Sequence, residues 1–144
     1  MSDPNRWKVL QGERDGPPVV IAINEDLLAD RQAGQLPWHL SIIVTIRELS
    51  AGRLPTQAET VILDAEEADF ERCVGSASGN ARLLARITWS GTRRLLYRVA
   101  DPKPAAAALG ARIAQRSYQR PFDYRMESDA GWALASDFLG GPPS

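Results

Sequence analysis

The order of the predicted elements from Trp38 onward constrains the fold of this chain more than any other feature. Trp38 to Arg47 alternates between apolar and more polar residues, which predicts a strand with one face in the core. A helix, a strand, a tight turn, a strand, a helix and a last strand follow it. This order is the split βαβ, or ferredoxin-like, pattern. Right-handed crossovers place both helices on one side of the sheet, so we expect an α+β fold built as a two-layer sandwich.

Local capping and turn signals set the bounds of these elements. Thr56 and Glu59 fit a capping box at the start of the first long helix, and Gly75 fits its end. Asp101 followed by Pro102 indicates the start of the second helix. The predicted elements are a helix at about 57–75, strands at 82–89 and 93–99, a helix at 102–118 and a strand at 122–127.

The two ends of the chain add smaller elements to this core. Asp15-Gly16 lies between two apolar runs and predicts an amino-terminal β-hairpin at 6–24, which either extends an edge of the sheet or caps its far face. The polar segment between Glu25 and Pro37 is interpreted as a loop with one helical turn. Asp129 is suited to cap a short carboxy-terminal helix at 129–139. With a ferredoxin-like core at 38–127, residues 1–144 form a single domain.

Composition narrows the class of protein. The chain is 44% hydrophobic but contains no apolar run near the roughly 20 residues that a membrane helix needs. Its one cysteine, Cys73, excludes an internal disulfide framework, and the charged segment after Met1 does not resemble a secretory signal. We therefore expect a soluble cytoplasmic protein with no membrane partner.

Charge is distributed unevenly although the net charge is only −1. Residues 1–80 hold 13 acids and 7 bases, whereas residues 81–144 hold 5 acids and 10 bases. In the second predicted hairpin Arg82, Arg86, Arg94 and Arg98 are expected on one solvated face, opposite an apolar face. That arginine face is the candidate binding site, for an acidic protein surface or a phosphate backbone.

An acidic ridge is expected on the first long helix, where Asp64, Glu67 and Glu71 share one face. A solvated or arginine-pairing face is favoured over a weak magnesium site. The leading hypothesis is a non-enzymatic domain that acts through a protein partner or self-association, with the two charged faces as complementary docking surfaces. RNA, or a ribonuclease, is the alternative partner, although the strand at 93–99 has Tyr97 as its only aromatic residue and so lacks the signature of RNA-recognition modules. No DNA partner is expected.

Catalytic and cofactor motifs are lacking in the sequence. No phosphate-binding glycine loop or paired metal-ligand motif occurs, so no cofactor or metal is expected. Cys73 lies on the apolar stripe of a predicted helix and is interpreted as structural. His39 is the only imidazole; a surface or capping role is favoured, and a pocket around His39 with Glu25 and Asp26 is kept as the enzymatic alternative.

Scattered residues resemble a bacterial family catalogued as domain of unknown function 695. These include Trp7, Asn24, a Gly52-Arg53-Leu54-Pro55 segment before a helix that carries Glu59, Leu63, Glu66 and Glu67, then Gly91, Tyr97, Asp101-Pro102, Asp129 and Trp132. Ala22 departs from the arginine expected two residues before Asn24. The family implies no activity; its architecture is similar to that of small regulators that bind ribonuclease E, which is the source of the RNA alternative.

Overall fold

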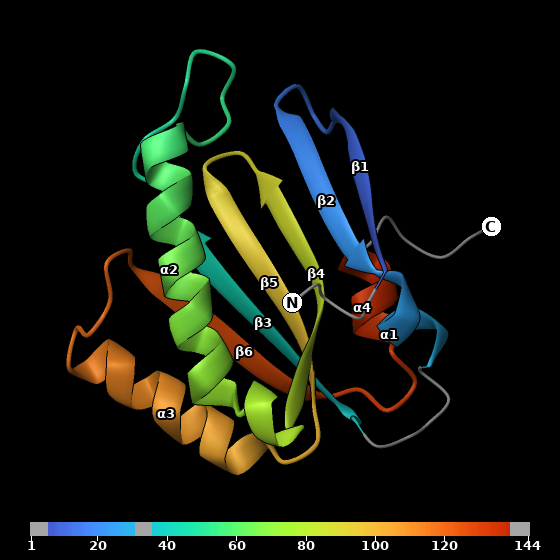
Figure 1. Ribbon diagram of the computed structural model, residues 1–144. Coiled ribbons are helices and arrows are strands. Elements are labelled where there is room, and N and C mark those ends of the chain that lie inside the picture. Colours follow the sequence, from blue (N-terminus) through green and yellow to red (C-terminus); the bar gives the residue numbers. More distant parts are fainter. Residues whose placement is uncertain (1–5, 31–35, 139–144) are drawn as a thin grey trace.

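The computed structural model describes residues 6–30 and 36–138. Six strands form one antiparallel sheet in the order β1-β2-β4-β5-β3-β6 (Figure 1). The strands are β1 (Trp7–Glu13), β2 (Pro18–Asn24), β3 (Trp38–Thr45), β4 (Ala81–Trp89), β5 (Thr92–Val99) and β6 (Phe122–Ser128). The helices are α1 (Glu25–Ala29), α2 (Gln57–Val74), α3 (Pro102–Ala114) and α4 (Ala133–Phe138). The predicted α+β class is confirmed.

The amino-terminal hairpin extends an edge of the sheet. β2 pairs with β4 over five residues, and β1 pairs with β2 over its whole length. Asp15 and Gly16 turn the chain between them, both at positive φ, which suits a tight turn. Of the two placements left open by the sequence, the structure therefore selects the edge.

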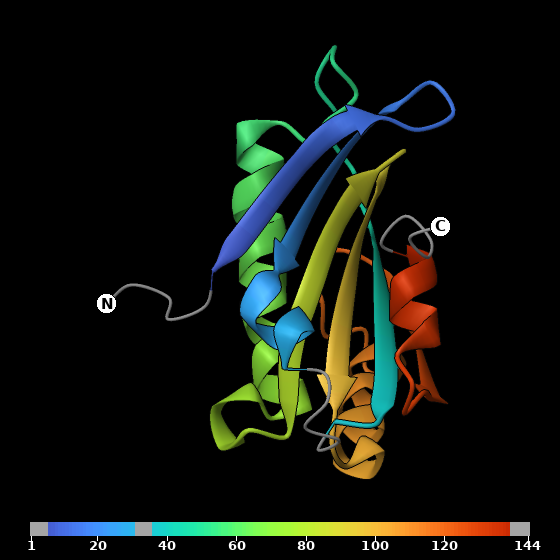
Figure 2. The same ribbon diagram turned by 90° about the vertical axis from the view of Figure 1, so that its right-hand side faces the viewer.

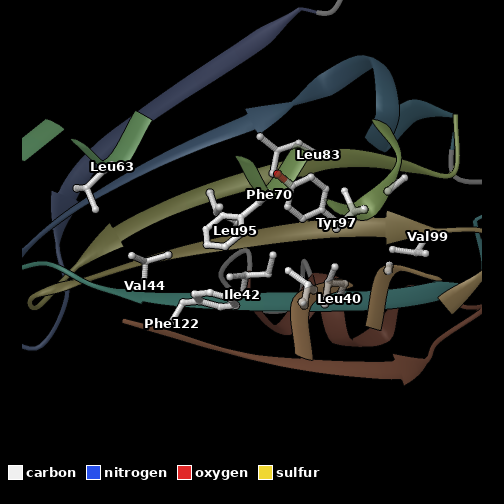
Figure 3. Close-up of a cluster of buried hydrophobic side chains, with 14 of the residues drawn as sticks. Leu40, Ile42, Val44, Leu63, Phe70, Leu83, Leu95, Tyr97, Val99 and Phe122 are labelled. Carbon is white, nitrogen blue, oxygen red and sulfur yellow. The ribbon is translucent and has the colours of Figure 1, made fainter. Parts of the chain in front are cut away.

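The long helices form one layer, and together with one face of the sheet they bury the larger core. The predicted caps at Thr56 and Asp101 both accept hydrogen bonds from the first turns of their helices. Figure 3 shows part of this core, where side chains of β3 and β5 meet Leu63 and Phe70 of α2. The ring of Phe70 packs edge-on against that of Phe122, with 4.7 Å between the centroids.

A second core covers the other face of the sheet, so the molecule has more than the two layers predicted. It joins Leu84 and Leu96 to Leu27 of α1 and to Trp132 and Ala135 near α4. Figure 2 shows α2 and α4 on opposite sides of the sheet. Among the described residues, no helix is long and apolar enough to cross a membrane.

Candidate functional site

The four arginines predicted to share one face of the second hairpin do not share it. A register shift in the middle of β4 marks a β-bulge, whose extra residue turns the following side chains to the other face. Arg82 therefore lies opposite Arg98, whereas Arg86 lies opposite Leu95 and faces α2. Ile87 moves in the same way, from the predicted inner row into the second core. The single arginine face was a wrong prediction.

Arg98 is fully buried and cannot serve as a surface contact. Its Nη1 donates to Asp129 Oδ2 at 3.0 Å, its Nε and Nη2 donate to the carbonyl of Leu36, and its guanidinium lies 4.4 Å from the ring centroid of Trp132. Burial lowers the pKa of Arg98, and Asp129 opposes that shift. Asp129 also accepts the backbone N–H of Ala133. This pair therefore attaches the start of α4 to the sheet.

His39 lies next to Arg98 on the neighbouring strand and is only 2% exposed. Burial, followed by the positive charge of Arg98, lowers the pKa of His39 to about 4, although Asp129 and Glu127 act in the opposite direction. The imidazole is thus neutral at pH 7. The predicted surface position is wrong, because His39 is buried.

Arg94 and Arg82 keep partial exposure at separate places. Arg94 donates to the hydroxyl of Ser41 at 2.8 Å, and burial lowers its pKa. With Arg14 and Trp89 it lines a pocket of about 320 Å³ near the β4–β5 turn. Arg82 lies at the other end of β4, 37% exposed and 3.9 Å from Asp30. The predicted binding residues therefore form no continuous patch.

The acidic residues of α2 other than Glu71 are paired with arginines of the same chain, as the arginine-pairing interpretation predicted for Asp64 and Glu67. Glu67 receives two hydrogen bonds from Arg86, at 2.7 and 2.5 Å. The other pairs are Asp64 with Arg93, Glu66 with Arg112, Asp69 with Arg72 and Arg112, and Glu59 with Arg120. Of the two surfaces that the sequence suggested for docking, only Arg86 and Glu67 pair with each other. The other carboxylates pair with arginines outside the predicted face.

A polar pocket of about 340 Å³ lies where the hairpin β1–β2 approaches the end of α2. Its principal walls are Trp7 of β1, Glu67 and Glu71 of α2, and Arg86 of β4. Asn24 has a structural role there, since its side chain accepts a hydrogen bond from Leu27 N and donates one to Leu83 O. The remaining lining residues are Ser76, Ala81, Arg82 and Leu83.

Glu71 is the exception among the α2 carboxylates in the described part of the chain, since it forms no ion pair there. Its partner is the hydroxyl of Ser76, which donates to Oε2. Burial raises the pKa of Glu71 above its ordinary value, and the charge of Glu67 adds to the rise, whereas Ser76 and Arg86 oppose it. The buried hydroxyl of Tyr97 lies nearby, and burial together with the charges of Glu71 and Glu67 raises the pKa of Tyr97 well above 10.

This arrangement has the chemistry of a site for a positively charged group. The guanidinium of Arg86 already lies 5.8 Å from the ring centroid of Trp7, so the indole takes part in cation–π contact. A carboxylate that is partly desolvated and lacks a cation gains most from one. Within the described residues, no cluster of three or more metal-ligating side chains exists, so a metal centre has no ligand set there.

A family model described as a family of unknown function, DUF695, matches residues 5–140, which is almost the entire chain. The chain belongs to the DUF695 family. No curated protein and no solved structure matches it. Because the family description gives no activity, the function of this DUF695 protein has to be argued from its geometry.

The residues that carried the family resemblance separate into two groups in the structure. Trp7, Asn24 and Glu67 come together at the pocket, although they are distant in sequence. Others are structural, as in the buried pairs of Glu59 and Asp129. Ala22, the departure from the family pattern, lies directly opposite Arg86 across β2 and β4. Arg86 therefore supplies a guanidinium next to the position where the family's arginine was expected.

Sequence reasoning did not identify the pocket. Glu67 and Glu71 were recognised only as members of an acidic ridge, and Trp7 only as a family position. The i, i+4 spacing of Glu67 and Glu71 places the two carboxylates on one helical face, and this was the sequence signal that pointed to the pocket. The bulge that turns Arg86 toward α2, where it pairs with Glu67 rather than with Glu71, has no local signature in β4.

Proposed function

We propose that this DUF695 protein is a non-enzymatic protein-interaction domain whose Trp7–Glu71 pocket binds a basic side chain of a partner protein. One observation carries the proposal. Glu71 is a half-buried carboxylate in a pocket and has no ion pair among the described residues, whereas the other carboxylates of α2 each have an arginine. A cation from a partner would give Glu71 the ion pair that the other α2 carboxylates have within the chain.

The pocket suits the end of one lysine or arginine side chain. Its volume of about 340 Å³ lies at the small end of ligand pockets, which commonly measure roughly 300–1,000 Å³. Trp7 offers an aromatic face to the alkyl stem and the cation. Glu71 offers a carboxylate whose hydrogen-bond partners are the hydroxyls of Ser76 and Tyr97 rather than a cation. Arg86 is held by both oxygens of Glu67, so it does not neutralise Glu71 directly.

The fold is consistent with a binding role. We also infer a ferredoxin-like arrangement for the core, supported by the order β4-β5-β3-β6 and by α2 and α3 on one face. Folds of this kind host many unrelated functions, so the site rather than the architecture carries the argument. A free thiol at Cys73 fits the cytoplasm as the proposed location.

The alternatives from the sequence have less support. The RNA hypothesis relied on a shared arginine face, of which Arg98 is buried and Arg86 is paired with Glu67. The enzymatic hypothesis relied on His39 with Glu25 and Asp26. His39 is buried instead among Arg98, Asp129, Glu127 and Arg94, while Asp26 pairs with Arg6 of the hairpin.

The test uses two small probes, agmatine, which carries a guanidinium and a primary ammonium, and n-butylamine, which carries only an ammonium; each is titrated into the folded protein and followed by backbone NMR shifts. We expect shifts centred on the backbone of Trp7, Glu71 and Ser76, and a loss of affinity of about tenfold or more in Glu71→Gln, as for a charged hydrogen bond. Asp123→Asn removes one negative charge from the exposed part of β6 and serves as the matched control.

The outcomes distinguish a specific cation site from general charge attraction, and a protein partner from a small amine. Equal weakening in Glu71→Gln and Asp123→Asn refutes a specific site and leaves only general attraction to acidic surface. A capped peptide with a single arginine that binds more tightly than free agmatine supports a protein partner. Free agmatine that binds as tightly as the peptide assigns the pocket to a small amine instead.

A further inference from the structure

From Val9 to Glu13, the backbone of β1 has one side without a partner among the described residues. Its other side pairs with β2, and hydrogen bonds from Glu25 N to Arg6 O and from Arg14 N to Pro17 O mark both ends of that ladder. Paired residues in an antiparallel ladder alternate between hydrogen-bonded and non-bonded positions. Even-numbered residues of β1 therefore turn their N–H and C=O groups toward β2. The outward groups belong to Trp7, Val9, Gln11 and Glu13.

Lys8 and Glu13 are the charged residues of this edge, which lacks the other protection that edge strands usually carry. Between Trp7 and Glu13 there is no proline and no register shift, and Val9 and Leu10 are 57% and 42% exposed. The opposite edge, β6, carries the charged residues Asp123, Arg125 and Glu127 at alternate positions. Unprotected edges with apolar residues pair readily with further strands. β1 is therefore the edge at which another strand can be added.

Strand β1 and the pocket share Trp7, which is both the first residue of β1 and a wall of the pocket. Trp7, Val9, Gln11 and Glu13 all lie on the face of the hairpin that looks toward α2, because residues two apart share a face. Figure 1 shows α2 beside the hairpin, and Val9, Gln11 and Glu13 on this face are exposed. Glu13 is the charged residue of this face, and Glu71 of α2 lies in the adjoining pocket, where Arg86 is held by Glu67. The two carboxylates favour a basic occupant.

We propose that an extended segment of a partner protein adds to β1 as a seventh strand and places a basic side chain into the Trp7–Glu71 pocket. Backbone hydrogen bonds to Val9, Gln11 and Glu13 supply affinity, and the basic side chain supplies specificity. This inference rests on the proposed function of the pocket and adds to it the conformation of the partner segment and its place on the sheet.

A second copy of this chain fits the edge less well. A symmetric antiparallel pair of β1 strands that uses all the outward groups sets Trp7 opposite Glu13 and Val9 opposite Gln11. The same register places Arg6 opposite Arg14, and like charges directly opposite each other destabilise a sheet. The structure thus favours a different chain as the occupant.

The experiment starts from a library of capped nine-residue peptides with one fixed arginine, selected on the full-length protein. The peptide with the highest affinity is then resynthesised with one N-methyl group at each position in turn. A strand donates to its neighbour through every second N–H. We expect losses of at least fivefold at alternate positions and near-neutral changes between them. Gln11→Pro removes one outward N–H, and Gln11→Thr keeps it and is the matched control.

The two proposals fail in different ways. Gln11→Pro is expected to weaken the peptide at least fivefold relative to Gln11→Thr while agmatine binds both equally. An N-methyl scan without a two-residue period overturns strand addition and leaves the pocket intact. A selected peptide that binds Glu71→Gln as well as it binds the wild type overturns the pocket. Dimerisation in sedimentation velocity that Gln11→Pro abolishes assigns the edge to a second copy and overturns the partner segment.

Discussion

Asp129→Asn is expected to cost more stability than any substitution of an exposed charge on this protein. The side chains of Arg98 and Asp129 are 0% and 8% exposed and are joined at 3.0 Å. The asparagine keeps a similar size and an oxygen for the N–H of Ala133, but it leaves the charge of Arg98 buried without a counter-charge. Removal of one member of a buried pair costs about 3–5 kcal/mol.

The chain contains a matched control for this change. Arg125 and Glu127 are joined at 3.1 Å, almost the same distance, but their side chains are 75% and 39% exposed. Glu127→Gln is therefore expected to cost about 0–1 kcal/mol, as exposed pairs do. Urea unfolding at pH 7, followed by circular dichroism, measures both variants. Equal losses below about 1 kcal/mol would refute the claim that burial makes the Arg98–Asp129 pair structural.

Three further predictions concern α2 and its ends. The hydrogen bond from Arg120 is the main cause that holds the pKa of Glu59 at about 2, against an ordinary value of 4.5. The ionised Glu59 therefore stabilises the fold by about 3 kcal/mol above pH 4.5, and this stabilisation is lost as the pH falls toward 2. The stability of Glu59→Gln should change less with pH over that range. The pKa of Glu71 is raised instead, so its contribution to folding stability falls as the pH rises through that pKa. Glu71→Gln should therefore raise the thermal midpoint at pH 8, although it weakens cation binding. A lower midpoint contradicts this. Gly75→Ala should cost about 1–2 kcal/mol in urea unfolding, because φ is +81° and the new Cβ meets Asn80 Cβ at 3.1 Å; a change within error contradicts the cap.

The order of the elements was predictable because each has a local signal. The Asp15-Gly16 turn, the cap at Thr56 and the Asp101-Pro102 start depend on residues within a few positions of one another. The apolar alternation of β3 was equally clear. These signals act before any tertiary contact forms, so the sequence contains them directly.

The faces of the second hairpin were not predictable in the same way. Strict alternation places Arg86 beside Arg82, and only the bulge in β4 separates them. The burial of His39 depends on the second core, which is assembled from α1, α4 and the strands. Both features follow from packing between segments far apart in the chain.

The candidate site depends both on residues that the sequence identified and on packing that it did not predict. The sequence identified Trp7 and Glu67 as family positions and Glu71 as part of an acidic face, but their meeting requires the hairpin to join β4 and Arg86 to turn toward α2. What distinguishes Glu71 from its neighbours is the lack of an arginine partner among the described residues. That property exists only once the other pairs have formed.

The most direct test of the central claim is the pKa of the Glu71 carboxyl, measured by carbon-13 NMR with and without saturating agmatine. The account predicts a pKa above the ordinary glutamate value in the free protein, because burial and Glu67 disfavour the charge. It also predicts a fall when agmatine binds, since a cation stabilises the carboxylate. An ordinary pKa that agmatine does not change would contradict the claim that Glu71 receives a basic group.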